Sequence, residues 1–309
     1  MPEPVISIQG LRKSYGELEA VRGIDLQVEP EEILAVLGPN GAGKTTTVEI
    51  LEGYRDRDSG EVKVLGIDPA KPTRAWRERI GIVLQGTALE TKLTVRESLE
   101  LYAGYFSNPR PVDEVIGLVG LEDKVDARAG KLSGGQMRRL DVGIALIGDP
   151  ELLFLDEPTT GFDPSARRQA WEMIAGLRDL GKTVLLTTHY MEEAQFLADR
   201  VAIINEGRIV AEDTPENLGD RDHLPTRITF RLPEGAGIEG LAGFEKITFD
   251  ESGPEPGVLA VLESHDSVND LNRLTGWAIE NRIELSGLEV RRPSLEDVYL
   301  QVTEEKAGA

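Results

Sequence analysis

A glycine-rich loop directly after an apolar run is the feature that most constrains how this chain of 309 residues folds. The loop reads Gly38-Pro39-Asn40-Gly41-Ala42-Gly43-Lys44-Thr45 and fits the pattern G-x-x-x-x-G-K-[ST]. It follows the run Ile33–Leu37 and precedes a helix-compatible run at 46–52, which is the strand–loop–helix context that a phosphate-binding loop requires. A glycine-rich turn that binds nothing is the alternative, and this context argues against it.

The residue types in and after this loop suit a polyphosphate and a magnesium ion. Glycines allow backbone N–H groups to wrap phosphate oxygens, and the helix N-terminus adds positive potential. Lys44 supplies a charge for the β- and γ-phosphates, and the Thr45 hydroxyl can ligate Mg²⁺, which prefers oxygen ligands. A second apolar run ends in two carboxylates: Asp156 can hold Mg²⁺ through water, and Glu157 can polarise a water for attack on the γ-phosphate. An acidic strand end that only faces solvent is the alternative.

Short apolar runs and helical patterns alternate along the first two thirds of the chain. The continuous runs suit parallel strands that are buried on both faces of a sheet. Runs at 5–8 and 24–28 alternate instead and predict an antiparallel region at one edge. Residues 86 to about 148 lack strand runs and are predicted to be helical, so the fold class is α/β with an antiparallel β edge and a helical insertion. The continuous runs are 33–37, 80–84, 152–155 and 183–187.

Two N-terminal capping patterns lie within the helical insertion. Thr94 with Glu97 forms a capping box, and it precedes a face made of Leu99, Tyr102, Ala103 and Phe106 at helical spacing. Ser133 is a good N-cap for a second helix. Gly134 and Gly135 follow it and expose N–H groups in reach of an anion, although a bare Ser-Gly-Gly is a common turn.

The pattern changes after Pro215, where strand-like runs are divided by turns rich in glycine and proline. We expect strands at 228–232, 247–249, 258–262 and 284–291, a helix near 267–282, and a last helix opened by a capping box of Ser294 and Asp297. The predicted domains are therefore 1–219, with its helical part at about 86–148, and a small α+β domain at 220–309. A packing extension and a dimer or regulatory contact are equally open for the second domain.

Composition excludes several classes of protein. Lys plus Arg is 34 and Asp plus Glu is 55, so the net charge is −21, which argues against a nucleic-acid partner. The absence of cysteine excludes disulfides and thiolate metal sites. The first ten residues have no basic and apolar signal-peptide pattern, and no apolar run approaches the ~18 residues of a transmembrane helix. We expect a soluble chain whose membrane role, if any, comes through another protein.

Five elements stand in one order: the phosphate loop, Gln85 at a strand end, Leu-Ser-Gly-Gly-Gln at 132–136, Leu-Leu-Phe-Leu-Asp-Glu-Pro at 152–158, and His189 at another strand end. In this combination the chain resembles the ATP-binding subunit of an ABC transporter over roughly residues 4–212. Unrelated phosphate-loop proteins share the first and fourth elements but not the third between them.

The resemblance implies a role for each matching residue. Tyr15 would stack on adenine, although it could also be an ordinary exposed strand-end tyrosine. Gln85 would contact Mg²⁺ or the attacking water and sense the membrane partner, and His189 would bond the γ-phosphate and orient the water. Asp163 lies in the matching loop that crosses a dimer interface, where Phe162 replaces the more usual leucine. The implied ATP-binding residues are Tyr15, Gly38, Pro39, Asn40, Gly41, Ala42, Gly43, Lys44, Thr45 and Thr46, with Ser133, Gly134, Gly135, Gln136 and Asp163 from a second copy. The implied metal ligands are Thr45, Gln85 and Asp156, and the implied catalytic residues are Glu157, His189, Gln85 and Lys44.

The runs at 36–54, 138–164 and 187–204 and the ending at 293–300 are similar to the daunorubicin-resistance-type branch of ABC-2-type exporters. That resemblance implies an ATPase homodimer that powers a multi-span permease of drugs or other hydrophobic small molecules, at the cytoplasmic face of the membrane. Its contact with the permease should lie near Gln85 and the helical insertion. An ATPase of a lipid, polysaccharide or peptide exporter is the alternative. Two further alternatives are a soluble ABC ATPase without a transport role and a non-hydrolysing regulatory module.

Overall fold

The computed structural model describes residues 3–86, 89–218, 225–233, 241, 243–244, 246–250, 257–291 and 296–299. The chain forms two compact units, Met1–Pro215 and Glu216–Ala309, whereas the sequence pattern places the division after residue 219. No helix in the described ranges is both long and apolar enough to span a bilayer.

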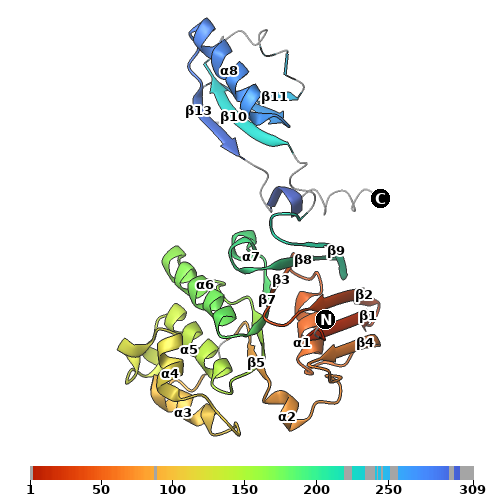
Figure 1. Cartoon of the computed structure of the whole chain (residues 1–309), viewed down its shortest axis with the longest axis vertical. Coiled ribbons are helices and arrows are strands. Elements are labelled where there is room, and N and C mark those ends of the chain that lie inside the picture. The colour runs from red at the N-terminus through yellow and green to blue at the C-terminus, as the bar shows by residue number, and fades with distance from the viewer. Residues whose placement is uncertain are drawn as a thin grey trace. The chain divides into compact units, whose positions relative to one another are not determined.

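A six-stranded sheet forms the centre of the first unit (Figure 1). Its strand order is β5-β6-β7-β3-β8-β9, with parallel pairing from β5 to β8 and an antiparallel β9 at the edge. Every residue of β3, β6 and β7 is buried, as expected for the inner strands of a parallel sheet. The strands are β3 Ile33–Leu37, β5 Ile80–Val83, β6 Leu152–Asp156, β7 Thr183–Thr188, β8 Arg200–Asn205 and β9 Arg208–Asp213.

A second, antiparallel sheet with the strand order β2-β1-β4 forms the predicted edge region. It consists of β1 Ile6–Tyr15, β2 Leu18–Val28 and β4 Ser59–Val64. Its buried side chains, among them Ile8 and Leu26, share one hydrophobic cluster with Leu34 and Val36 of the central sheet. The predicted α/β core with an antiparallel edge is therefore confirmed.

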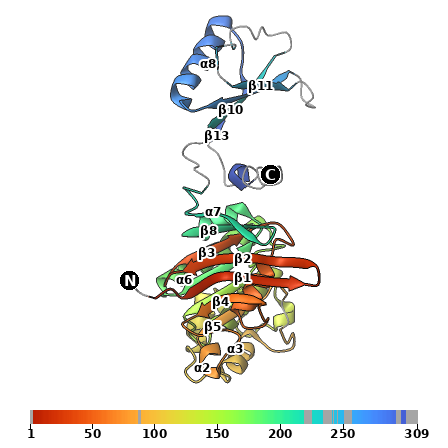
Figure 2. The same ribbon diagram turned by 90° about the vertical axis from the view of Figure 1, so that its right-hand side faces the viewer.

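Helices of the insertion gather on the side of the first unit away from the antiparallel sheet (Figures 1 and 2). The Thr94–Glu97 capping box forms, but the helix after it ends at Ala103, so the expectation that Phe106 lies on its face is wrong. The chain leaves the helix at Gly104, and the Phe106 ring lies over Gly148, where a Cβ would be only 2.3 Å from the ring. The helices of this unit are α1 Lys44–Leu51, α2 Arg74–Arg77, α3 Val95–Ala103, α4 Val112–Leu118, α5 Gly134–Leu146, α6 Pro164–Asp179 and α7 Met191–Leu197.

In the second unit, a four-stranded antiparallel sheet of order β11-β12-β10-β13 packs against helix α8. Phe230, Leu262 and Leu274 lie in its core. The elements are β10 Thr226–Leu232, β11 Ile247–Asp250, β12 Val258–Ser264, α8 Ser267–Asn281 and β13 Ser286–Arg291. The capping residue Ser294 lies outside the described residues, so that prediction stays a prediction.

Candidate active site

The phosphate loop joins the end of β3 to the start of α1, and its glycines have conformations that other residues tolerate poorly. Gly41 and Gly43 have φ values of 81° and 104°. A Cβ on Gly43 would lie 2.4 Å from the Ala20 carbonyl oxygen, and one on Gly38 would lie 2.3 Å from that of Ile204. The loop can therefore approach its neighbours this closely only with glycine at these positions.

The buried Lys44 side chain reaches back from the start of α1 to the first residues of the phosphate loop. Its Nζ donates hydrogen bonds to the carbonyl oxygens of Gly38, at 2.7 Å, and Pro39, at 3.1 Å. Burial lowers the pKa of this ammonium, and the nearby carboxylates of Glu157 and Asp156 oppose that shift. A cation that burial has partly desolvated gains from an added anion such as phosphate, because the anion compensates for the lost hydration.

A cavity of about 410 Å³ brings three separate parts of the sequence together. The antiparallel sheet contributes Tyr15, which is 40% exposed and has the Arg55 guanidinium 5.2 Å from its ring centroid. The loop contributes its backbone and Lys44, and the ends of the central strands contribute Gln85 and Glu157. The residues that line it are Tyr15, Leu18, Ala20, Asn40, Gly41, Gly43, Lys44, Thr45, Thr46, Gln85 and Glu157.

Glu157 stands immediately after β6 in a left-handed conformation, with φ of 45°. Its backbone N–H donates to the carbonyl oxygen of Thr187 at 3.1 Å. Its carboxylate Oε2 accepts hydrogen bonds from Gln85 Nε2, at 3.2 Å, and from Thr160 Oγ1, at 3.0 Å. Positive φ is costly for a residue with a side chain, so several contacts hold this carboxylate in a conformation it would not adopt alone.

His189 follows β7, and its ring approaches the same carboxylate. The Nδ1 atom lies 3.2 Å from Glu157 Oε1. These two atoms are close, but their geometry is not that of a hydrogen bond, and Nδ1 forms none within the described ranges. Histidine, glutamate and glutamine thus meet at one point although they come from three different strand ends.

The three predicted metal ligands offer the oxygen donors that Mg²⁺ prefers. Thr45 and Gln85 line the cavity, and Asp156 lies buried at the end of β6, where the Thr187 hydroxyl donates to its Oδ1. Among the described residues, no three His, Cys, Asp or Glu side chains cluster as a metal site of their own. The donors therefore fit a magnesium ion that takes its remaining ligands from phosphates and water.

The predicted signature residues do not line this cavity. Ser133 caps α5: its Oγ accepts from Gln136 N at 3.3 Å, and Gln136 Oε1 accepts from Ser133 N at 3.0 Å. Ser133 and Gly134 are exposed at this helix start. Asp163 is also exposed, and it caps α6 by accepting from Ser165 N and Ala166 N. The N-termini of α5 and α6 are therefore both accessible to solvent.

Sequence reasoning missed Arg138, a buried side chain of α5. Its guanidinium donates to the carbonyl oxygens of Leu84, of Asp156 at 2.6 Å and of Pro158 at 3.2 Å. Burial lowers the pKa of Arg138. One side chain therefore ties the ends of β5 and β6 to the signature helix. An arginine two residues after the signature motif is only a weak sign of this role. Its acceptors are backbone carbonyl groups, which every sequence has, so no partner residue type points to it.

The fold and this site define a phosphate-loop ATPase of the ABC type, and comparisons with known proteins agree. Residues 21–160 match the family described as ABC transporter, and residues 226–294 match the one described as ABC transporter domain-containing protein-like, C-terminal domain. Daunorubicin resistance ATP-binding protein DrrA3 of Streptomyces coeruleorubidus is 37% identical over 98% of this chain and 97% of its own. Nod factor export ATP-binding protein I of Rhizobium etli is 44% identical over 96% of this chain and 93% of its own.

Among solved structures, a dimeric ATP-binding cassette in a post-hydrolysis state, bound to ADP and Pi, is 25% identical. The match covers 68% of this chain and 98% of that cassette, with a TM-score of 0.61. The chain belongs to the family of ABC transporter ATP-binding subunits. It is an ATP-hydrolysing subunit that powers an exporter.

Proposed function

We propose that one ATP with Mg²⁺ occupies the 410 Å³ cavity and that its triphosphate lies along the phosphate loop. The Tyr15 ring stacks on the adenine at one end, and Lys44 exchanges its two carbonyl partners for phosphate oxygens at the other. Thr45, Gln85 and Asp156 hold the magnesium ion, which neutralises charge on the phosphates when it is bound.

Glu157 acts as the base that polarises the attacking water. The observation that carries this proposal is that its carboxylate lines the phosphate cavity while Gln85 and Thr160 orient it. We assign His189 to the γ-phosphate and the same water because its ring lies beside the Glu157 carboxylate, with Nδ1 3.2 Å from Oε1. Lys44 stabilises the charge that develops on the phosphate oxygens.

A second copy of the chain completes each site. One chain has a single phosphate loop and a single signature, and the exposed N-terminus of α5 lies outside the cavity of its own chain. In a head-to-tail dimer, Ser133, Gly134, Gly135 and Gln136 of one copy close over the phosphates held by the other, with Asp163 at the interface. The dimeric state of the similar cassette supports this arrangement.

The dimer works at the cytoplasmic face of the membrane, bound to a multi-span permease near Gln85 and the helical insertion. Similarity to a daunorubicin resistance protein along nearly the whole chain favours drugs or other hydrophobic small molecules as cargo. The Nod factor export protein of Rhizobium etli is more identical, at 44%, so an exporter of another class of molecule is the second candidate.

The test is reconstitution of this chain with the membrane protein that co-purifies with it, in vesicles with the ATPase face outward. Daunorubicin uptake that requires ATP and Mg²⁺ and stops when Lys44 is replaced by Ala supports drug export. Coupled ATP hydrolysis without daunorubicin uptake points to the second candidate. A chain that neither binds the permease nor hydrolyses ATP contradicts the proposal.

A further inference from the structure

A buried threonine in the central sheet contacts both acidic residues that follow one another at the end of β6. Thr187 lies in β7, where the parallel pairing of the two strands places it beside Asp156. It is fully buried, and the three residues before it in the strand are apolar. A buried hydroxyl group is costly unless it forms hydrogen bonds, so the partners of this one indicate what it does.

The Thr187 hydroxyl accepts one hydrogen bond and donates another. Its Oγ1 accepts from the backbone N–H of Glu157, at 3.1 Å, and donates to Oδ1 of Asp156. A hydroxyl group has one proton and an ionised carboxylate can only accept, so the two contacts direct that proton toward Asp156. One side chain therefore holds the carboxylate of Asp156 and the backbone of Glu157 together.

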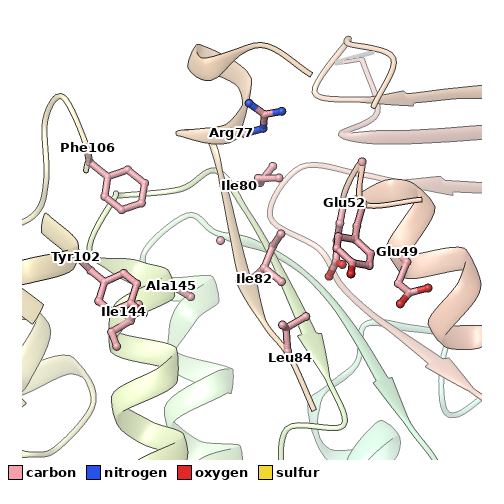
Figure 3. A pocket seen from close by; sticks show the side chains of 13 residues that line it. Glu49, Glu52, Arg77, Ile80, Ile82, Leu84, Tyr102, Phe106, Ile144 and Ala145 are labelled. Atoms are coloured by element: carbon pink, nitrogen blue, oxygen red, sulfur yellow. The ribbon is translucent and has the colours of Figure 1, made fainter. Parts of the chain in front are cut away.

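Nothing else in the described part of the chain forms a hydrogen bond with the carboxylate of Asp156. Lys44 is near, but its Nζ bonds two carbonyl oxygens of the phosphate loop. Glu52 follows α1 and lines a groove together with Glu49 (Figure 3). It is itself an acid, and burial, followed by the charges of Asp156 and Glu49, raises its pKa to about 8. The orientation of the Asp156 carboxylate thus depends on Thr187.

We propose that Thr187 is a positioning residue for magnesium binding: it holds Oδ1 of Asp156 and leaves Oδ2 available to the metal ion or its water. This inference rests on the proposed function, because it takes Asp156 as one of the groups that hold Mg²⁺. Partners that orient a metal-binding side chain contribute strongly to metal affinity, and removal of one typically costs about 10- to 100-fold.

The backbone of Glu157 keeps a partner when the hydroxyl is removed. Its N–H donates to the carbonyl oxygen of Thr187 as well as to Oγ1, at 3.1 Å in both cases. The carbonyl contact alone can therefore hold the left-handed conformation of Glu157, whose φ is 45°. Loss of the hydroxyl should consequently affect the Asp156 carboxylate more than the position of Glu157.

Two substitutions separate the hydroxyl from the bulk of the side chain. Thr187→Val keeps the branched shape that suits a strand but loses the hydroxyl, whereas Thr187→Ser keeps the hydroxyl and loses the methyl group. Thr183→Val is the matched control at the first residue of the same strand. Thr183 is also buried, and its Oγ1 also accepts a backbone N–H, from Glu31 at 2.9 Å.

The experiment measures binding of AMP-PNP, an ATP analogue that is not hydrolysed, to the full chain by calorimetry, with Mg²⁺ and with EDTA. In the wild-type chain Mg²⁺ should tighten binding. Thr187→Val should reduce this gain about tenfold and leave the affinity in EDTA unchanged. Thr187→Ala, which also lacks the hydroxyl, should show the same loss. Thr187→Ser and Thr183→Val should keep the full gain.

A full magnesium gain in Thr187→Val and Thr187→Ala overturns the inference, and so does equal weakening with and without Mg²⁺. A loss in Thr187→Ser as large as that in Thr187→Val also overturns it, because the methyl group would then be responsible. The wild-type chain separates the two kinds of failure. AMP-PNP binding that does not respond to Mg²⁺, or no binding, contradicts the proposed function, whereas a wild-type gain that Thr187→Val retains overturns only this inference.

Discussion

Gln85 donates a hydrogen bond from its Nε2 to Oε2 of Glu157, over 3.2 Å. The two residues follow β5 and β6, which are neighbours in the parallel sheet although 72 positions separate them in the chain. Carboxyl ends of parallel strands meet at one edge of a sheet, and this is where ligands of open α/β folds bind. The contact therefore joins the end of β5 to the carboxylate that we place at the reacting water.

Glu157→Gln should abolish hydrolysis while ATP binding persists. The amide oxygen can still accept from Gln85 or Thr160, so the local structure is kept, but the group no longer takes a proton. We expect phosphate release to fall by about 100-fold or more, with an unchanged nucleotide dissociation constant. The control is Glu172→Gln, because the Glu172 side chain is exposed on α6, and this variant should behave as wild type. Normal turnover in the Glu157 variant would remove it from the role of base.

Gly134→Asp tests whether the signature acts on a second copy. A Cβ at Gly134 meets nothing within 4 Å, so the new side chain fits its own chain, and an acid at a helix N-terminus favours the helix. Across a dimer, however, the carboxylate would repel the phosphates of the partner. We expect no hydrolysis, although the melting temperature does not fall.

Mixing this protein with Lys44→Ala should restore activity, since a mixed dimer has one site with both defects and one with neither. Crosslinking of Ser133→Cys to a cysteine in the opposite phosphate loop, formed only with ATP, supports the same conclusion. A mixture that stays inactive and also lacks the ATP-dependent crosslink argues against shared sites.

Arg138→Gln should destabilise the first unit by about 3 kcal/mol, because three buried carbonyl groups lose a charged donor. The adjacent Arg139→Gln is a matched control: its guanidinium bonds the carbonyl of Gly120 near solvent, so less than about 1 kcal/mol is expected. Urea unfolding followed by circular dichroism gives both values. Similar values for the two variants would show that the Arg138 contacts contribute little.

Stability should fall with rising pH because of Glu52. Its pKa is about 8 in the folded chain and 4.5 without these surroundings, so the folded state keeps a proton that the unfolded state has lost. Between these two values the free energy of unfolding should decrease by roughly 1.4 kcal/mol per pH unit. Below this window the contribution is fully present, and above it the contribution is lost.

Glu52→Gln should remove that slope and should be more stable than wild type at pH 9, as seen by urea unfolding across a pH series. Glu49→Gln provides the comparison, since its carboxylate is paired with Arg55. An unchanged slope in the Glu52 variant would show that its carboxyl group ionises freely in the folded chain.

Much of the fold follows from local patterns. The runs at 33–37 and 183–187 form strands at nearly the expected bounds, because continuous apolar runs have few alternatives to a sheet buried on both faces. The helix after Thr94 is the exception at its end. Its face continues to Phe106 by spacing, but the helix ends at Ala103 with Gly104 as its C-cap, and the Phe106 ring packs instead against Gly148, far along the chain.

The sequence by itself determined the phosphate loop, the cap of the signature helix and the order of the strand-end carboxylates, because these depend on neighbouring residues and on their backbone conformations. Only the tertiary structure decided which strand ends meet, and so which side chains surround Glu157. It alone showed that Arg138 donates to three carbonyls and that Glu52 is buried without a cation. Such properties depend on distances between distant segments and on the solvent that packing excludes, and neither is encoded by spacing along a chain.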